Sequence, residues 1–201
     1  MARRSWTANM PRLYDVVRQP LEALGLRRWR AALWADVPTS GRGLEVGAGP
    51  GAGEAYCASR NAVRIDVSHA MLARARATMG AADTDTRFTL GVADVQALPF
   101  RDRAFDWAVA SLVFCEVADP LAGLRELRRV VRPGGSLHLL EHVQPRGRIA
   151  AAAARALSAV TGPLFGEHFD RRTHETVRTA GFALDHAKWG PGGALVRLVA
   201  R

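Results

Sequence analysis

Residues 41–53 read GRGLEVGAGPGAG, and the rest of the chain is best understood from this stretch. Leu44–Val46 predicts the end of a short buried strand, and glycine then recurs at every second position from Gly47 to Gly53. A strand that runs into such a loop makes a turn that needs positive φ and lets the backbone approach a ligand closely. The run also satisfies a loose G-x-G-x-x-A pattern, so by itself it is compatible with a dinucleotide.

Acidic residues near the glycine loop favour a different ligand. Glu45 stands just before the first glycine of the loop. A fixed carboxylate does not help to bind a pyrophosphate, whereas it helps a ligand that carries an ammonium and a sulfonium. Asp66 closes the next apolar run, 62–67, and Asp94 follows Gly91 at a spacing that suits one nucleoside.

Five ordered motifs in residues 40–145 resemble class I S-adenosylmethionine-dependent methyltransferases, in the branch that contains the ubiquinone/menaquinone-type and phospholipid enzymes. The motifs are 45–51 (EVGAGPG), 65–72 (IDVSHAML), 93–100 (ADVQALPF), Phe105-Asp106 and 127–135 (LRRVVRPGG). Segments 111–117 and 140–143, followed by a small-residue helix, look like a sub-branch of membrane-associated alkyl-thiol methyltransferases. The N-terminal hydrophobic anchor of that sub-branch's animal members is not found here.

The resemblance implies that S-adenosyl-L-methionine is the cofactor and S-adenosyl-L-homocysteine the product. Asp66 would accept hydrogen bonds from both ribose hydroxyls, and Asp94 would accept one from the adenine amino group. Glu45 would face the methionine amino group. The structural alternatives are a surface acid at Asp66 and a turn or N-cap residue at Asp94. Val67, Met71 and Leu112 would sandwich the adenine ring, or they would be ordinary core residues. The full set of residues expected to bind the cofactor is Glu45, Gly47, Ala48, Gly49, Gly51, Asp66, Val67, Met71, Ala93, Asp94, Val95, Ser111 and Leu112.

The implied chemistry is an in-line displacement of the methyl group, which needs neither a nucleophilic triad nor a metal. A thiol or amine acceptor needs little help, whereas a phenol or carbon acceptor needs a general base. Glu116 and His142 are the catalytic candidates, and Tyr14, His142 and His168 are candidates for contact with the acceptor. The structural alternatives are a half-buried helix anchor for Tyr14 and a hydrogen bond to the adjacent loop for His142. No cysteine and histidine spacing here predicts a metal site.

The fold expected from residue 41 onwards is α/β, because strands and helices alternate as in a parallel sheet covered on both faces. The predicted architecture is a Rossmann-like class I methyltransferase sheet closed by an antiparallel pair, 182–188 and 194–200, around the Gly190–Gly193 turn. One methyltransferase domain would span 1–201. Its parts would be an N-terminal helical lid (1–36), a cofactor-binding core (40–145) and a C-terminal region of helices and closing strands (146–201).

Local signals place three further helices. Asp119 predicts an N-cap followed by proline at the first helical position, with Pro133–Gly135 as the stop. Residues 149–161 predict an alanine-rich helix that is apolar nearly all round, bounded by Gly162, and such a helix must be buried or face something apolar. Asp170 predicts the cap of a helix that ends before the final strand pair.

The chain has 28 basic and 19 acidic residues and a net charge of +9, and Lys188 is its single lysine. This arginine skew is compatible with coding bias, and the cluster Arg27–Arg30 with Trp34 is too small to favour nucleic acid. Peripheral contact with anionic lipid is better supported. The absence of a signal peptide and of an apolar run near ~18 residues, with only two cysteines, predicts a cytoplasmic protein.

Three other functions compete with methyl transfer to a small, lipophilic acceptor such as a thiol, a quinol or phenol, or an amine or phospholipid head group. An NAD-dependent reductase is disfavoured by Glu45 and by the lack of a Tyr-x-x-x-Lys motif. The second competing function is that of a protein that binds the cofactor but catalyses no reaction. RNA methylation is disfavoured because no Asn-Pro-Pro-Tyr motif or RNA-binding module is found.

Overall fold

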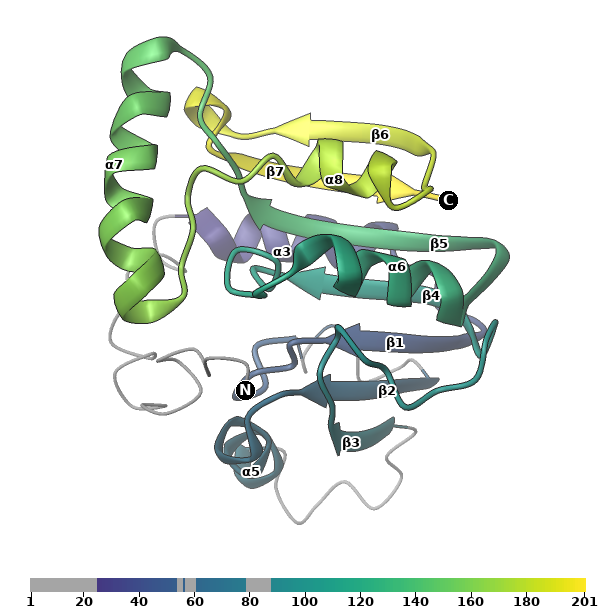
Figure 1. The fold of residues 1–201 in the computed structure, drawn as a ribbon. Coiled ribbons are helices and arrows are strands. Elements are labelled where there is room, and N and C mark those ends of the chain that lie inside the picture. The colour runs from purple at the N-terminus through teal and green to yellow at the C-terminus, as the bar shows by residue number, and fades with distance from the viewer. Residues whose placement is uncertain (1–24, 54–55, 57–60, 79–87) are drawn as a thin grey trace.

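The computed structural model describes residues 25–53, 56, 61–78 and 88–201, which build a seven-stranded sheet in the order β3-β2-β1-β4-β5-β7-β6 (Figure 1). The five strands β1 to β5 run parallel to one another, and β7 runs antiparallel to both β5 and β6. The predicted α/β class and the antiparallel closing pair are therefore confirmed. The strands are β1 (Arg42–Val46), β2 (Asn61–Asp66), β3 (Phe88–Val92), β4 (Phe105–Ser111), β5 (Val131–His142), β6 (Leu184–Trp189) and β7 (Leu195–Ala200).

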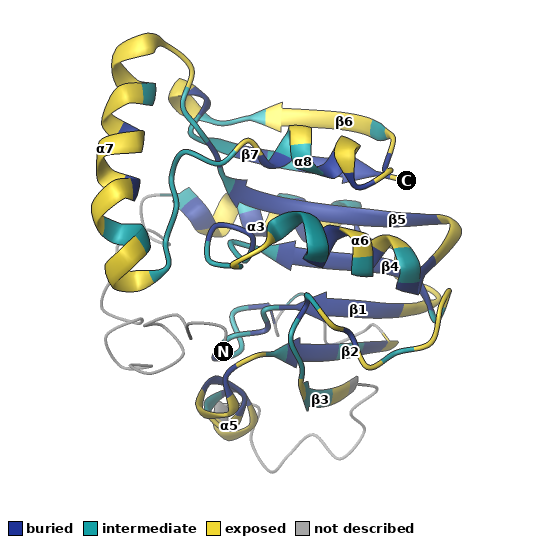
Figure 2. Ribbon diagram, in the orientation of Figure 1, coloured by how far each residue is buried: buried dark blue, intermediate teal, exposed yellow. Residues whose placement is uncertain are grey.

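Helices cover both faces of the sheet because successive side chains of a strand point to opposite faces. Trp107 and Val109 of β4 pack with α3 behind the sheet, whereas Ala108 and Ala110 join the core in front of it, under α6 (Figure 1). The middle strands are consequently buried along most of their length (Figure 2). The helices are α3 (Arg27–Asp36), α5 (His69–Thr78), α6 (Pro120–Val130), α7 (Arg148–Phe165) and α8 (Thr173–Thr179).

Helix α6 begins as predicted but ends earlier. The Asp119 carboxylate accepts a hydrogen bond from the Ala122 N–H at 3.0 Å, with Pro120 at the first helical position. The helix ends at Val130 because Val131 already pairs with the start of β4, so the expected stop at 133–135 is wrong. These residues lie within β5.

Two predictions about the C-terminal helices are also wrong. Helix α7 continues through Gly162 and ends at Phe165. Gly166, with a φ of 79°, is its C-cap. Gly162 serves close packing, because a Cβ there would lie 2.8 Å from the His168 ring. Helix α8 starts at Thr173 without a side-chain cap, so Asp170 does not cap it.

The Asp119 cap makes a stability prediction. Asp119→Ala should lower the free energy of unfolding by about 1 kcal/mol, because an N-terminal N–H of α6 loses its acceptor. Denaturant unfolding followed by circular dichroism measures this change. Asp170→Ala is the matched control and should stay within ~0.5 kcal/mol of the parent. Equal losses in the two variants would contradict the assignment.

Candidate functional site

The glycine loop after β1 has the backbone that its sequence predicts. Gly47, Gly49 and Gly51 have φ values of 67°, 56° and 101°. At Gly47 a Cβ would also lie 2.3 Å from Val113 Cγ2, so glycine lets the loop pass under the segment that follows β4. A Cβ on Gly49 would meet no atom closer than 3.9 Å, so the loop has an open side there.

Asp66, at the end of β2, is tied to the glycine loop. Its Oδ2 accepts a hydrogen bond from the Gly49 N–H at 2.9 Å, and its Oδ1 accepts one from the Ser68 N–H at 2.8 Å. Burial raises the pKa of Asp66, and the two backbone bonds oppose that rise. Each oxygen keeps capacity for a second donor. The neighbouring Val67 is 48% exposed, so an apolar surface lies beside the carboxylate.

Glu45 has a charged partner that sequence reasoning did not find. The parallel register sets it beside Arg64 of β2, whose Nε donates a hydrogen bond to Glu45 Oε2. Both side chains are buried. Burial raises the pKa of Glu45, and the Arg64 charge counteracts it. The negative charge that was expected to attract an ammonium is thus already paired within the sheet.

Asp94 lies near the carboxyl ends of the parallel strands and also stabilises a turn. Its Oδ1 accepts hydrogen bonds from the backbone N–H and the side-chain amide of Gln96, at 2.9 and 3.0 Å. Gln96 Oε1 in turn accepts the Asp119 N–H at 2.8 Å. The turn role, which was the structural alternative, is present. The Ala93 N–H donates to the Asp66 carbonyl at 3.1 Å, which brings the second and third strand ends together.

Two further predicted residues are mainly core side chains. Met71 and Val95 are 4% and 5% exposed, so their side chains pack inside the protein.

Leu112 is half-buried and has a φ of 58°, a conformation that is rare for a branched apolar residue. Such a bend at a strand end is typical of functional sites. Sequence alone carried no signal for it.

Helix α3 adds two residues that sequence reasoning did not assign to the site. Arg30 Nε donates a hydrogen bond to Ser111 Oγ at 3.2 Å, and Trp34, one turn later, lies on the same side of the helix. The arginine–tryptophan cluster, considered above for nucleic acid, is therefore partly internal. A small pocket behind the loop is lined by Arg30, Trp34, Glu45, Gly47, Ala48, Gly49, Pro50, Ala52, Gly53 and Ser111.

The segment after β4 is held from two sides. Glu141 Oε1, at the end of β5, accepts the N–H groups of Val113 and Phe114 at 3.0 and 3.1 Å. Burial raises the pKa of Glu141 to about 7 although these bonds oppose the rise. On the other side, the Arg171 guanidinium donates to the carbonyls of Phe114 and Val117. The segment is therefore positioned by residues far away in sequence.

Two carboxyl groups meet next to this segment. Glu116 and Glu167 share a side-chain hydrogen bond, and the pKa of Glu167 is raised to about 7, by burial first and then by the Glu116 charge. A hydrogen bond between two carboxyl groups requires a shared proton. Cys115 beside them is a buried free thiol whose pKa burial and the nearby carboxylates raise.

The histidine candidates lie on the same side as this pair. His142 ends β5 and contacts the Phe169 ring at a centroid distance of 5.7 Å. Burial lowers the pKa of His142, and its hydrogen bond to the Ala194 backbone opposes this, so the loop-bound alternative is also present. The His168 N–H donates to the Cys115 carbonyl at 3.0 Å. Tyr14 lies outside the described residues, within which no group of three or more His, Cys, Asp and Glu side chains could hold a metal ion.

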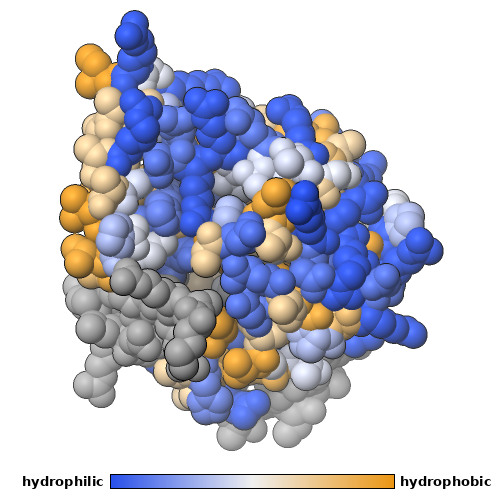
Figure 3. Space-filling view, in the orientation of Figure 1, coloured by the Kyte–Doolittle hydropathy of each residue, from blue (hydrophilic) through white to orange (hydrophobic). Residues whose placement is uncertain are grey.

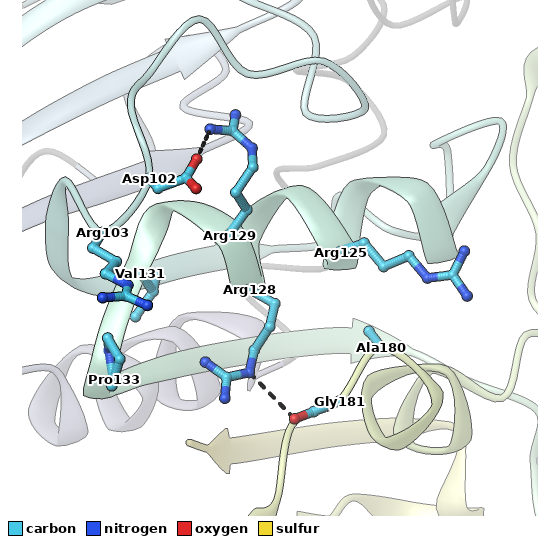
Figure 4. A pocket seen from close by; sticks show the side chains of 9 residues that line it. All are labelled: Asp102, Arg103, Arg125, Arg128, Arg129, Val131, Pro133, Ala180 and Gly181. Carbon is cyan, nitrogen blue, oxygen red and sulfur yellow. Dashed lines mark hydrogen bonds and ion pairs between the residues drawn. The ribbon is translucent and has the colours of Figure 1, made fainter.

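A basic pocket lies at the opposite end of the parallel strands, near the start of β5 (Figure 4). Two of its arginines have structural partners. Arg129 pairs with Asp102 and Glu126, and Arg128 Nε donates to the Gly181 carbonyl at 3.2 Å. Its position separates it from the predicted cofactor residues. The lining residues are Asp102, Arg103, Arg125, Arg128, Arg129, Val131, Pro133, Ala180 and Gly181.

Comparison with known proteins agrees with this geometry. A methyltransferase domain model matches residues 44–139, from β1 into β5. A phosphatidylethanolamine N-methyltransferase of Cereibacter sphaeroides is 36% identical over 65% of this chain and 64% of its own length. The ubiquinone/menaquinone biosynthesis C-methyltransferase UbiE of Geobacter sulfurreducens is 31% identical over 68% of this chain and 56% of its own. Residues 44–139 are therefore a methyltransferase domain of the class I S-adenosylmethionine-dependent family.

The chain spans roughly half to two thirds of the length of these relatives, with 56% and 64% of the two proteins matched. The fold also matches the crystal structure of the [4+2]-cyclase SpnF, with a TM-score of 0.73, 20% identity and coverage of 87% of this chain and 80% of that one. A shared fold does not by itself define a reaction. The reaction has to be argued from the site.

The cofactor of the family is S-adenosylmethionine, and the residues of this chain fit it. The glycine loop has an open side at Gly49, and Asp66 has acceptor capacity next to the exposed Val67. The carboxyl ends of parallel strands are where such folds bind nucleosides. The contact of each residue with the cofactor stays a prediction.

Proposed function

We propose that this chain transfers the methyl group of S-adenosylmethionine to a small, lipophilic acceptor. The observation that carries the proposal is the Asp66 carboxylate at the end of β2, bound to the Gly49 N–H at 2.9 Å and still able to accept two hydroxyl groups. Asp66 thereby couples the loop that would hold the methionine part to the point where the ribose would lie. A carboxylate at this strand end also binds the ribose of NAD in dinucleotide-binding folds, so a reductase is disfavoured by the lack of a Tyr-x-x-x-Lys motif rather than by Asp66.

The reaction is a displacement at carbon. A lone pair of the acceptor forms the new bond to the methyl carbon, the carbon–sulfur electron pair stays on sulfur, and S-adenosylhomocysteine leaves. The sulfonium is already activated, so the protein mainly aligns the acceptor and excludes water. An acceptor that must lose a proton passes it to a base in the cleft.

The relatives and the side chains near Glu116 support the proposed acceptor class. The two relatives are named for a quinone and for a phospholipid head group. Here the buried Cys115 and the Phe169 ring, which contacts His142, are apolar side chains near the predicted acceptor residues. A thiol, a quinol or phenol, or an amine head group on a lipophilic body would suit them.

Incubation with radiolabelled S-adenosylmethionine and a panel of thiols, quinols and lipid amines tests the proposal. Label should move to at least one lipophilic acceptor, and S-adenosylhomocysteine should inhibit the transfer. Tight cofactor binding without transfer to any panel member would favour a binding protein without catalysis. Mass spectrometry of co-purified cofactor that finds a nicotinamide dinucleotide would favour the reductase.

The Glu116–Glu167 pair predicts a pH dependence. Glu167 holds a proton below about pH 7 and loses it above, so the pair carries its second negative charge, and is the stronger base, only on the alkaline side. For an acceptor that must lose a proton, kcat/KM should rise with pH and level off above about 7. Glu167→Gln removes the second charge and should move the midpoint down by about one pH unit. A series of pH–rate profiles measures it.

His142→Ala is the control for this prediction, and in this variant kcat/KM should still rise near pH 7. The pKa of a neutral, buried His142 lies below its ordinary 6.5, so a histidine base would give a limb at lower pH. If kcat/KM instead rises at a pH below 6.5, and if Glu116→Gln keeps this rise while His142→Ala removes it, the base is His142.

A further inference from the structure

Helix α7 has an exposed apolar surface on the side away from the protein. Ile149, Leu157, Val160 and Leu164 are 88%, 48%, 57% and 65% exposed, and we call this set the outer face of α7. At 3.6 residues per turn these positions form one stripe, centred about 120° around the helix from the buried Ala154 and Ser158. Figure 2 shows the exposure of the helix, and Figure 3 shows apolar side chains along it.

The inner face of α7 is attached firmly to the protein. Ser158 Oγ accepts the Phe169 N–H at 2.8 Å, and Thr161 Oγ1 donates to the Glu167 carbonyl at 2.7 Å. Gly162 packs directly under the His168 ring. The outer face is thus presented by a fixed helix, so its exposure is a property of the folded chain.

The charges on the helix have one sign. Arg148 and Arg155 are its charged residues, both are exposed, and no acidic residue occurs in residues 148–165. The whole chain carries a net charge of +9. The arginines lie about 150° around the helix from the centre of the outer face. A helix with aliphatic side chains on one side and arginines on another is typical of a membrane interface, where aliphatic side chains enter the lipid and arginines meet phosphate groups.

The position of α7 suits a planar partner. The helix stands across the edge toward which the parallel strands point (Figure 1). None of the helices in the described part of the chain meets the length and apolarity that crossing a bilayer demands. A helix of this kind can therefore lie on a membrane but not pass through it.

We infer that the outer face of α7 docks the protein on the surface of an anionic phospholipid membrane. The absence of acidic residues on α7 and the net charge of +9 match an anionic lipid surface better than a second copy of this equally basic chain. The inference concerns a surface and not the reaction, so it stands independently of the proposed methyl transfer.

Vesicle co-sedimentation tests the docking. The full chain should bind vesicles of phosphatidylcholine that contain phosphatidylglycerol, bind phosphatidylcholine alone more weakly, and lose affinity as salt rises. Val160→Asp should weaken binding at least about tenfold, because a charge would enter the apolar layer. Val92→Asp is the matched control, since Val92 is 56% exposed on another element, and it should bind like the parent.

Arg148→Glu combined with Arg155→Glu tests the charge contribution without touching the apolar stripe, and Arg125→Glu is its control. Circular dichroism melting verifies that each variant is folded, and if Val160→Asp fails to fold, the arginine pair carries the test. Failure of the parent to bind, or equal binding by Val160→Asp and Val92→Asp, would overturn the inference. So would a dimer, found by light scattering, that Val160→Asp dissociates without changing vesicle binding.

Discussion

Asp66→Ala is expected to weaken the binding of S-adenosylhomocysteine about 100-fold or more. Hydrogen bonds to a charged group contribute about 1.5–3 kcal/mol each, and the carboxylate is positioned to accept two from the ribose. The same substitution removes the acceptor for the Gly49 and Ser68 N–H groups, so the loop would lose its anchor as well. Isothermal titration calorimetry measures the change in Kd.

Asp66→Asn separates the two contributions. One carbonyl oxygen remains, so the asparagine can keep part of the loop anchor while it loses the charge and one acceptor. Its affinity should fall between those of the parent and the alanine variant. Asp102→Ala removes a carboxylate that pairs with Arg129 at the opposite edge, and it should bind like the parent. An unchanged Kd for Asp66→Ala would remove Asp66 from the cofactor site.

Arg64→Met is expected to lower the free energy of unfolding by about 3–5 kcal/mol. It leaves the buried Glu45 carboxylate without the guanidinium that donates to it, and an uncompensated buried charge is costly. For a domain of this size such a loss corresponds to a fall in Tm of roughly 10 °C. Thermal unfolding without ligand measures it.

The double variant Glu45→Gln with Arg64→Met tests whether the loss comes from the charge. It should recover most of the stability, because neither side chain is then charged. The pKa of Glu45 is raised in the folded protein, so its stabilising contribution is complete below the unfolded value and is lost as pH rises through the folded value. The defect of Arg64→Met should therefore shrink at acid pH. A defect that is constant with pH and persists in the double variant would point to packing instead.

Much of the fold could be predicted because its signals are local. The positive φ values at the glycine loop, the Asp119 cap and the closing strand pair each depend on a few neighbouring residues. The errors also have local causes. Gly162 was taken as a helix end, but the constraint on it is the His168 ring, which meets it only after the chain has turned back.

The five ordered motifs were sufficient to predict the family of the domain, and the acidic residues at successive strand ends predict the region of the site. Their partners were not predictable, because each is set by strand register or by helix docking. Glu45 faces Arg64 through the parallel pairing of β1 and β2, and Glu116 meets Glu167 because the chain returns after α7. The same holds for Arg30 on Ser111, across 81 residues.

Residue types and their spacing along the chain were thus enough for the kind of fold, the cofactor family and the edge of the sheet where the nucleoside should lie, since backbone preferences and strand-end motifs act over short distances. The charge state of Glu45, the paired carboxyls and the exposure of α7 followed from contacts between distant segments. Burial and charge pairing depend on which surfaces meet in three dimensions, and no local pattern in the sequence encodes that.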